Sequence, residues 1–419
     1  MSPAADTEAD LPVALLEPRE GTPPVQATES QLGELCALVA AGRGPVGIDA
    51  ERASGYRYSQ RAYLVQLRRE GAGTALIDPI ALPDLSALDE VLAETEWVLH
   101  AASQDLACLA ELGLVPRRLF DTELAGRLAG FERVGLGAIV ERVLGLTLEK
   151  GHSAADWSTR PLPATWLTYA ALDVEVLIEL RDALDAELRA QGKRDWAAQE
   201  FAALISAPPA APRVDPWRRT SGIHKLRSRR ELATVRALWQ ARDEIAARRD
   251  IAPGRILPDS AIVAATSANP KGPTELLTLP VYGGRANRRL VRIWFGAIQE
   301  ARALPESDLP QIGLASDAPP PVNRWADREP AAAARLGAAR TALAALSERV
   351  RVPVENLLTP ELVRRLTWEP PADHGEEAVA GVLAAAGARQ WQIELTAGLL
   401  SAALDPGAAR DSGAAQAPT

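Results

Sequence analysis

Two carboxylates in the run VGIDAE stand where the neighbouring residues predict a buried strand. Residues 46–48 are Val-Gly-Ile, and Asp49 and Glu51 follow two positions apart, so both side chains point to one face of the strand. Mg²⁺ is typically bound by one or two carboxylates together with water and substrate phosphate. The pair is therefore a candidate divalent-metal site.

A third acid, Asp105, stands at the start of a predicted helix. It follows the apolar run 97–99, which predicts a second buried strand. Ser103 is the expected N-terminal cap of that helix. A junction between a strand and a helix can present a ligand, so Asp105 is a candidate partner of the first two acids.

Tyr169 and Asp173 lie one turn apart on a helix that the hydrophobic spacing predicts over residues 164 to 188. The same stripe continues through Leu177, Leu180, Leu184 and Leu188. A charge on such a stripe is costly unless it is paired or metal-bound. Tyr169 would lie beside the metals, and with an ordinary phenol pKa of about 10 it is better suited to orient a water than to act as a strong base.

Four clustered carboxylates would repel one another and raise one another's pKa values. Two cations about 4 Å apart would remove that repulsion, activate a water and stabilise the leaving oxygen of a phosphodiester. An isolated Asp-x-Glu is a weak signal, because most such tripeptides are surface charges. Here the acids lie on one strand, after a second strand and on a late helix, all within one domain-sized stretch. Together they are a strong signal for a metal site.

At these residues the sequence resembles the DEDDy family of 3′-to-5′ exonucleases, and within it the ribonuclease D branch. The resemblance covers about residues 44 to 190 and continues more loosely to about 405. It extends to the motifs RAYLVQL (61–67), ALIDP (75–79), HAASQDL (100–106), FDTELAG (120–126) and ADWSTRPLP (155–163). It implies a ribonuclease-H-like α/β exonuclease domain with a mixed sheet, followed by all-helical domains of the HRDC type, which bind nucleic acid.

The resemblance also implies roles for single residues and a reaction. The catalytic residues would be Asp49, Glu51, Asp105, Tyr169 and Asp173. The four acids would hold two divalent cations, Mg²⁺ or Mn²⁺, and Tyr169 would position the water. Ala50 and Gln104 depart from the family's motifs, but neither is a ligand. The implied activity is a 3′-5′ exoribonuclease that releases 5′-mononucleotides and trims tRNA precursors and other small structured RNAs.

Two other functions stay open at this point. A DNA 3′-5′ exonuclease could carry the same acids, since no residue visibly reads a 2′-hydroxyl. A non-catalytic RNA-binding protein could keep a relic of the site, although all five key residues are present.

The composition excludes several further classes. With 47% hydrophobic and 24% charged residues over 419 positions, the chain predicts a soluble globular protein of two or three domains. It has no apolar run of about 18 residues and no signal-peptide pattern, so we expect a cytoplasmic monomer without membrane contact. Cys36 and Cys108 lie in apolar helical patterns and are predicted to be buried free thiols. Four scattered histidines offer no zinc cluster, and no Walker A loop or complete G-x-G-x-x-G predicts a nucleotide cofactor.

Proline-rich stretches divide the chain. Strands near 46–51, 62–67 and 74–78 predict an antiparallel meander in the first domain. The predicted division is a flexible leader (1–28), the exonuclease domain (29–205), a linker (206–216), an HRDC domain (217–302), a linker (303–325), a second HRDC-like helical domain (326–405) and a disordered tail (406–419).

The sequences of the two helical domains indicate a diverged repeat at an offset of 100 residues. The aligned pairs are Pro253 with Pro353, Leu257 with Leu357 and Val263 with Val363. Each copy predicts a helix, a break that contains proline, and a second helix. The second copy is the fainter one, and its helices could instead form an unrelated cap.

The net charge of −9 is unevenly spread, because residues 213–302 carry +10 and the rest of the chain −19. The basic segment predicts phosphate contacts that are independent of base sequence. The candidate nucleic-acid contacts are Arg218, Arg219, Lys225, Arg227, Arg229, Arg230, Arg285, Arg288 and Arg289, with Arg292 beside them. The alternative is a solvated helix face.

A few residues near the acids could border the terminal nucleotide of a substrate. These are Tyr56, Tyr58, Arg61, Asp156, Trp157 and Arg160. Trp157 and Arg160 stand in a loop rich in Ser, Thr and Pro, where packing within the loop is the alternative role. Trp217, Trp239 and Trp294 have the spacing of core residues.

Overall fold

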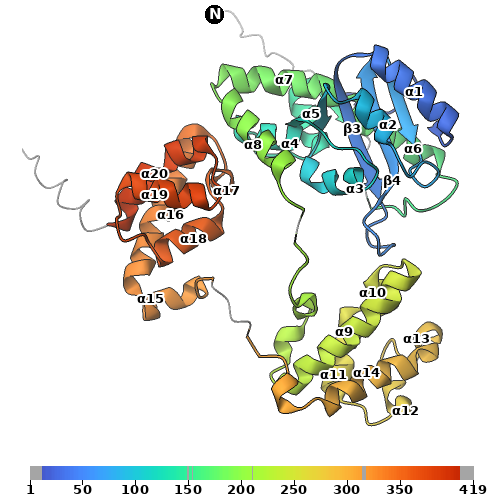
Figure 1. Cartoon of the computed structure of the whole chain (residues 1–419), viewed down its shortest axis with the longest axis vertical. Coiled ribbons are helices and arrows are strands. Elements are labelled where there is room, and N and C mark those ends of the chain that lie inside the picture. Colours follow the sequence, from blue (N-terminus) through green and yellow to red (C-terminus); the bar gives the residue numbers. More distant parts are fainter. Residues whose placement is uncertain (1–11, 149–150, 153, 210, 314–317, 406–419) are drawn as a thin grey trace, which may run out of the picture.

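Three units follow one another along the chain (Figure 1). The computed structural model describes residues 12–148, 151–152, 154–209, 211–313 and 318–405. The first unit is an α/β structure and the other two are helical, which confirms the predicted fold class. Residues 1–11 of the predicted leader and the predicted tail lie outside the described residues.

A six-stranded mixed sheet forms the centre of the first unit. Its strand order is β2-β5-β4-β3-β6-β7. The strands are β2 (Val25–Gln26), β3 (Arg43–Arg52), β4 (Ala62–Glu70), β5 (Gly73–Ile77), β6 (Glu96–Leu99) and β7 (Arg118–Asp121). The pairs β3–β4 and β4–β5 are antiparallel, as the meander predicts, because the short links between them cannot make a crossover. The pairs β3–β6, β6–β7 and β2–β5 are parallel.

Helices cover the sheet. They are α1 (Glu29–Ala41), α2 (Ser86–Val91), α3 (Leu106–Ala110), α4 (Thr122–Ala129), α5 (Leu136–Leu144), α6 (Ala164–Glu175), α7 (Leu177–Ala190) and α8 (Arg194–Ser206). Of these, α6 packs on β3, β4 and β5, whereas α7 packs on β3, β6, α4 and α5. The helix that carries Tyr169 and Asp173 therefore lies against the strand that carries Asp49 and Glu51.

The single helix expected over residues 164 to 188 is wrong, because the chain breaks at Val176 between α6 and α7. Val176 has φ −100° and ψ −8°, and its side chain is fully buried. The break sits on β3 at Gly47, where an added Cβ would lie 3.2 Å from the Leu177 Cβ and 3.4 Å from the Val174 carbonyl oxygen. Glycine thus permits the close approach of the α6–α7 junction to the strand.

Residues 12–28 are not the flexible leader that composition predicts. β1 (Val13–Leu15) pairs in parallel with β8 (Leu146–Leu148), and β2 pairs with β5. The Arg19 side chain donates to Glu179 at 2.5 Å and lies 3.7 Å from the buried carboxylate of Glu175. The short apolar run 13–15, which lies among prolines and acids, is long enough to form a two-stranded sheet with β8, and β2 adds an edge strand to the central sheet.

The first helical unit is built on α9 (Arg229–Arg249), whose start is fixed by a capping box at Ser228. The helices that follow are α10 (Pro253–Ile256), α11 (Asp259–Ala268), α12 (Pro273–Leu276), α13 (Arg285–Arg289) and α14 (Val291–Ala303). Trp217 and Trp294 are buried in its core, as predicted, and Trp239 is half-buried against it.

The second helical unit repeats this plan at an offset of 101 residues. It comprises α15 (Trp325–Arg328), α16 (Pro330–Val350), α17 (Val354–Leu357), α18 (Pro360–Trp368), α19 (Glu376–Ala385) and α20 (Gln390–Leu404). Both long helices end at a residue in the left-handed region, Asp250 with φ 47° and Arg351 with φ 52°. The predicted offset of 100 is off by one, because Pro253 is the first residue of α10 whereas Pro353 caps α17 from outside. Proline suits both places, since neither needs its N–H.

The first helical unit touches the α/β unit at the α9–α10 corner. The Asp250 carboxylate accepts hydrogen bonds from the backbone N–H groups of Tyr58 (3.2 Å) and Ser59 (2.9 Å). It also accepts one from the Tyr63 hydroxyl at 3.2 Å. The Ala252 N–H donates to the Tyr56 carbonyl at 2.9 Å. The corner therefore holds the segment that leads from β3 to β4.

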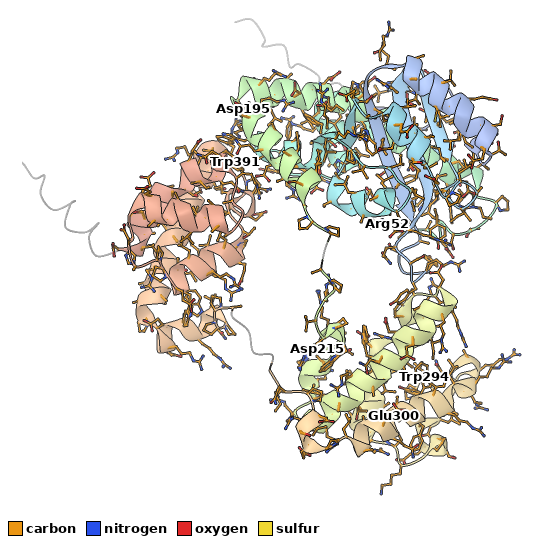
Figure 2. All side chains as sticks on the ribbon, viewed as in Figure 1. Arg52, Asp195, Asp215, Trp294, Glu300 and Trp391 are labelled. Carbon is orange, nitrogen blue, oxygen red and sulfur yellow. The ribbon has the colours of Figure 1, made fainter. Side chains whose placement is uncertain are left out.

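The second helical unit touches the α/β unit along α8. Figure 2 labels Trp391 at this contact, beside Asp195. Its ring stacks on Trp196 with centroids 5.0 Å apart, and its indole N–H donates to Glu200 at 2.9 Å. The same carboxylate holds Arg389 at 2.5 Å. Among the described residues, no helix is both long and apolar enough to cross a membrane.

Candidate active site

Three of the predicted metal ligands meet in space. Asp49 and Glu51 project from β3 and Asp173 from α6, and one carboxylate oxygen from each lies within 4.8 Å of the others. The strand spacing thus brings the first two acids together as expected. Gln66, directly across from Asp49 on β4, donates a hydrogen bond to the Asp49 carboxylate at 2.9 Å.

The fourth acid, Asp105, lines the same hollow of about 460 Å³ but stands apart from the other three. Its carboxylate lies 3.5 Å from the guanidinium of Arg52. Asp105 itself precedes α3, and the expected cap by Ser103 is wrong. The turn is held instead by Asp121, whose carboxylate accepts the N–H groups of Ala101 (3.2 Å) and Ala102 (2.9 Å).

The negative charges of the four acids are not balanced by neighbouring positive charges, and their pKa values are raised. Burial, followed by Asp49 and Asp173, raises the pKa of Glu51 to about 10. Burial and Asp49 raise the pKa of Asp105 to about 8, and burial also raises the pKa values of Asp49 and Asp173. Buried, mutually repelling carboxyls are the oxygen donor set that a divalent cation satisfies. The residues present therefore fit divalent-metal binding.

Tyr169 also lines the hollow, as predicted. The His152 ring meets it edge-on at 5.7 Å, and Trp157 packs nearby at 6.4 Å. Burial and the charges of Asp173 and Glu51 raise the pKa of the Tyr169 phenol. A phenol that keeps its proton can orient a water but is a poor base.

Three residues around the acids were missed by the sequence analysis: Arg52, Gln66 and Asp121. Gln66 is the one polar residue in the buried part of the strand 62–67, and Asp121 follows the fully buried Phe120. Polar residues at those places were a usable signal. Arg52 gave none, because its reach to Asp105 depends on how two distant segments meet.

The loop that carries Trp157 and Arg160 is packed rather than open. Trp157 is fully buried beside Trp166, with ring centroids 5.3 Å apart. Arg160 donates to Asp78 and to the carbonyls of Tyr63 and Trp157. A buried ring and a fully engaged guanidinium do not support contact with substrate, so the packing alternative is the better account of both.

The predicted border of the terminal nucleotide also differs from expectation at two tyrosines. The Tyr58 hydroxyl donates to Asp243 at 3.1 Å, and the Arg255 guanidinium lies 4.0 Å from the Tyr56 ring centroid. Both tyrosines thus face the first helical unit. Arg61 is exposed above the Tyr63 ring and stays a predicted RNA contact.

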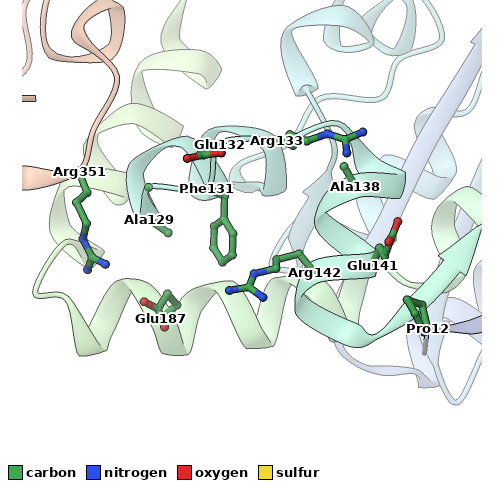
Figure 3. A pocket seen from close by; sticks show the side chains of 11 residues that line it. Pro12, Ala129, Phe131, Glu132, Arg133, Ala138, Glu141, Arg142, Glu187 and Arg351 are labelled. Carbon is green, nitrogen blue, oxygen red and sulfur yellow. The ribbon is translucent and has the colours of Figure 1, made fainter. Parts of the chain in front are cut away.

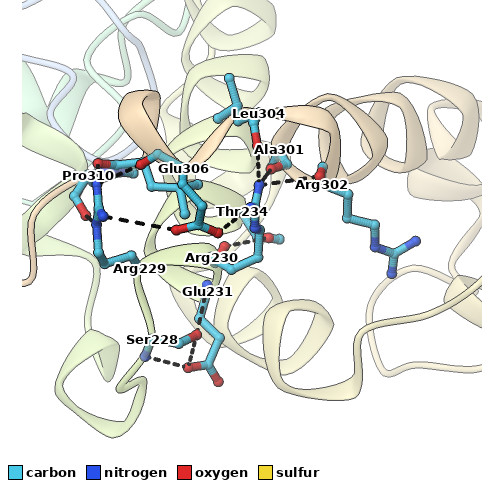
Figure 4. A network of polar contacts seen from close by, with 11 residues as sticks. Ser228, Arg229, Arg230, Glu231, Thr234, Ala301, Arg302, Leu304, Glu306 and Pro310 are labelled. Atoms are coloured by element: carbon cyan, nitrogen blue, oxygen red, sulfur yellow. Dashed lines mark hydrogen bonds and ion pairs between the residues drawn. The ribbon is translucent and has the colours of Figure 1, made fainter.

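The predicted basic contacts divide into engaged and exposed residues. Arg229 and Arg230 donate to backbone carbonyls of the segment after α14 and pair with Glu306 (Figure 4). Arg218 pairs with Asp215 at 2.9 Å. These three hold the helical unit together. The residues exposed at the surface are Arg219, Lys225, Arg227, Arg285, Arg288, Arg289 and Arg292.

A larger hollow of about 790 Å³ lies elsewhere, where Arg351 of the second helical unit meets α4, α5 and α7 (Figure 3). Its lining mixes Arg133, Arg142 and Arg351 with Glu132, Glu141 and Glu187. None of the predicted catalytic acids lines it. The smaller hollow is therefore the candidate active site.

The mixed sheet and its acidic hollow, which fits divalent-metal binding, agree with the class of a 3′-5′ exonuclease. The family described as 3′-5′ exonuclease matches residues 25–189. HRDC domain matches 231–298, and 3′ to 5′ exonuclease C-terminal domain matches 318–404.

Whole-chain relatives agree with this class. Ribonuclease D of Acidiphilium cryptum (strain JF-5) is 35% identical over 332 residues, which cover 75% of this chain and 81% of the relative. Ribonuclease D of Granulibacter bethesdensis is 32% identical over 361 residues, or 84% and 87% of the two chains. The chain belongs to the ribonuclease D family, and it is a 3′-5′ exoribonuclease.

Solved structures resemble nearly the whole chain. A protein from Bifidobacterium adolescentis is 40% identical, with a TM-score of 0.87 over 94% of this chain and all of that one. Escherichia coli RNase D, described as an exoribonuclease involved in structured RNA processing, is 26% identical, with a TM-score of 0.67 over 92% and 99% of the two chains. The three-unit plan is thus shared with a ribonuclease D.

Proposed function

We propose that this exoribonuclease trims the 3′ ends of tRNA precursors and other small structured RNAs. The observation that carries the proposal is the acidic hollow in one unit of a chain whose next unit exposes a set of basic side chains. The acids supply hydrolysis, and the basic residues supply affinity for the RNA backbone that does not depend on base sequence. The description of Escherichia coli RNase D names structured RNA, which supports the same substrate class here.

We assign the catalytic roles to five residues. Asp49, Glu51 and Asp173 would hold one divalent ion, and Asp49 with Asp105 a second. When bound, the two ions supply an activated water and charge stabilisation for the leaving 3′ oxygen. Tyr169 keeps its proton and orients the attacking water through its hydroxyl. Gln66 fixes the Asp49 carboxylate, and Asp121 fixes the turn before Asp105.

A labelled precursor tests the catalytic assignment. Wild type and Asp49→Asn are incubated with a 3′-labelled tRNA precursor in Mg²⁺, in Mn²⁺ or in EDTA. We expect mononucleotide release by the wild type with metal only, and a loss of at least about 10³-fold in the variant, because a neutral amide replaces an anionic ligand. Full activity of the variant, or activity in EDTA, contradicts the assignment.

A parallel digestion tests the alternative substrate. Matched RNA and DNA strands with 3′ overhangs are digested under the same conditions. Faster loss of the DNA strand would favour a DNA exonuclease that carries the same acids.

Salt dependence tests the basic surface. The triple variant Arg285→Ala, Arg288→Ala, Arg289→Ala removes exposed charges that line one shallow hollow. We expect weaker RNA binding and a slope of log affinity against log salt that falls by about 2, because each phosphate that is no longer neutralised reduces the slope by about 0.7. The matched control is Arg218→Ala, whose charge is paired with Asp215 and should leave the slope unchanged. An unchanged slope in the triple variant would reassign these arginines to a solvated face.

A further inference from the structure

We propose that Arg52 is a further catalytic residue, which binds the scissile phosphate of the RNA. This inference rests on the proposed function of the acidic hollow and adds a residue that its assigned roles lack. Arg52 is the last residue of β3 and follows Glu51 directly. Figure 2 shows it on the side of the α/β unit that faces the first helical unit.

The geometry places a cation inside an acidic hollow. Arg52 lines the hollow together with the four acids, and its side chain is 26% exposed. The pairing of β3 with β4 is irregular at this point, since Glu51 faces Leu64 whereas Arg52 faces Ala62. The guanidinium reaches the Asp105 carboxylate at 3.5 Å, and its charge partly offsets the rise in pKa that burial causes at Asp49, Glu51 and Asp105. It is thus a fixed positive charge at the reaction centre.

The donors of Arg52 are available to a ligand. A guanidinium carries five N–H donors, and within the described ranges that of Arg52 makes one ion pair, with Asp105, and no hydrogen bond. The other arginines around the site are engaged in binding the protein: Arg57 donates to Ser158 at 2.7 Å, and Arg160 donates to Asp78 and backbone carbonyls. Arg52 alone of these three combines a place in the hollow with unused donors.

A phosphodiester is the anion that this site must admit. A planar guanidinium offers the phosphate oxygens two parallel hydrogen bonds, which the carboxyls of the hollow cannot donate. In hydrolysis a bond forms between the water oxygen and phosphorus, the bond from phosphorus to the 3′ oxygen breaks, and that oxygen takes up a proton. Arg52 exchanges no proton in this sequence. It stays charged and contacts the phosphate oxygens, where negative charge accumulates in the transition state.

Binding of the product separates this role from a merely structural one. The probes are adenosine 5′-monophosphate and adenosine, titrated by calorimetry into the full chain with Mg²⁺. We expect Arg52→Gln to weaken binding of the monophosphate at least about 10-fold and to leave adenosine binding unchanged. Arg52→Lys keeps the charge but loses the planar pair of N–H donors, so it should weaken binding of the monophosphate a few-fold. On RNA, kcat of Arg52→Gln should fall about 10²-fold, as when one donor to a transition-state oxygen is removed.

The matched control is Arg43→Gln, at the other end of the same strand, where an exposed arginine pairs with Glu70 at 3.1 Å. It should bind both probes as the wild type does. The inference is overturned if Arg52→Gln binds the monophosphate normally, or if it loses both probes equally, as a general distortion of the hollow would cause. Wild-type hydrolysis and the Asp49→Asn variant are measured alongside. If the wild type does not hydrolyse RNA, or if Asp49→Asn keeps full activity, the proposed function is rejected. The binding of the two probes still tests the role of Arg52 in that case.

Discussion

A buried carboxyl with a raised pKa favours the folded protein only while it is protonated. In the ion-free protein this applies to Glu51, with a pKa of about 10, and to Asp105, with a pKa of about 8. Their unfolded pKa values are about 4. The stability that these protons provide is fully present below pH 4 and is lost as the pH rises through the folded pKa values. The site therefore opposes folding at neutral pH unless a cation fills it.

We accordingly predict that, in EDTA, the free energy of unfolding falls between pH 5 and pH 9. Saturating Mg²⁺ should reduce this fall, because a bound cation removes the repulsion that keeps the carboxyls protonated. Urea denaturation at several pH values, with and without Mg²⁺, measures the effect. Asp105→Asn serves as the comparison, since it removes one titrating group and should flatten the curve in EDTA. Equal stability at pH 5 and pH 9 in EDTA would contradict the raised pKa values.

At the scale of elements, the α9–α10 corner holds the segment between the two strands nearest the acids. Asp250 accepts two of that segment's backbone N–H groups, from Tyr58 and Ser59. The segment begins just after Arg52, the last residue of β3. The helical unit is therefore part of what positions the edge of the active site.

We predict that Asp250→Gly speeds hydrogen exchange at the amides of Tyr58 and Ser59 by about 10-fold, or about 1.4 kcal/mol of local opening. Glycine keeps the left-handed corner free of strain, so the change isolates the lost hydrogen bonds. Arg351→Gly is the control, because it makes the same change at the equivalent corner of the second unit. Exchange that is unchanged in Asp250→Gly, or equally fast in both variants, would refute the holding role.

The sequence predicted the elements that follow a local period. The strands around Asp49 and Gln66 alternate or form continuous apolar runs, and the structure has them in the expected antiparallel order. The carboxylates of Asp49 and Glu51 lie close together as predicted, because strand geometry alone sets the direction of side chains two positions apart.

Features that depend on tertiary contact could not be predicted. The helix break at Val176 has no local breaker and follows from two packing surfaces, which α6 and α7 cover separately. Arg52 meets Asp105 across 53 residues of chain. Arg229 and Arg230 stand in a basic segment that is typical of a binding surface. Their partners, however, lie more than 70 residues away in the segment after α14.

At the scale of the whole molecule, Glu200 connects the second helical unit to the α/β unit. Its side chain is buried and serves two partners, Arg389 and the indole of Trp391. Removing the carboxylate leaves the Trp391 indole N–H without its acceptor and leaves Arg389 only its hydrogen bond to the Gly387 carbonyl. The cost is about 2 kcal/mol, less than for a fully buried pair, because the Arg389 side chain is 32% exposed.

We predict that Glu200→Ala lowers the temperature at which the second helical unit unfolds in scanning calorimetry. Glu361→Ala is the control, because it breaks exposed pairs with Arg364 and Arg365 and should cost no more than about 0.5 kcal/mol. Identical thermograms for the two variants would show that the Glu200 contact does not hold the units together.

The hydrogen bonds at Asp250 join two units that the chain also connects covalently, so this contact need not be strong. The chain leaves α8 at Ser206 and reaches the next helical turn at Pro216, so a short segment joins the catalytic unit to the unit that carries Asp250. A covalent connection this short turns the contact between the two surfaces into an intramolecular one, at a higher effective concentration than separate proteins would reach. A docking contact that would be too weak to hold separate proteins can thus stay mostly formed here.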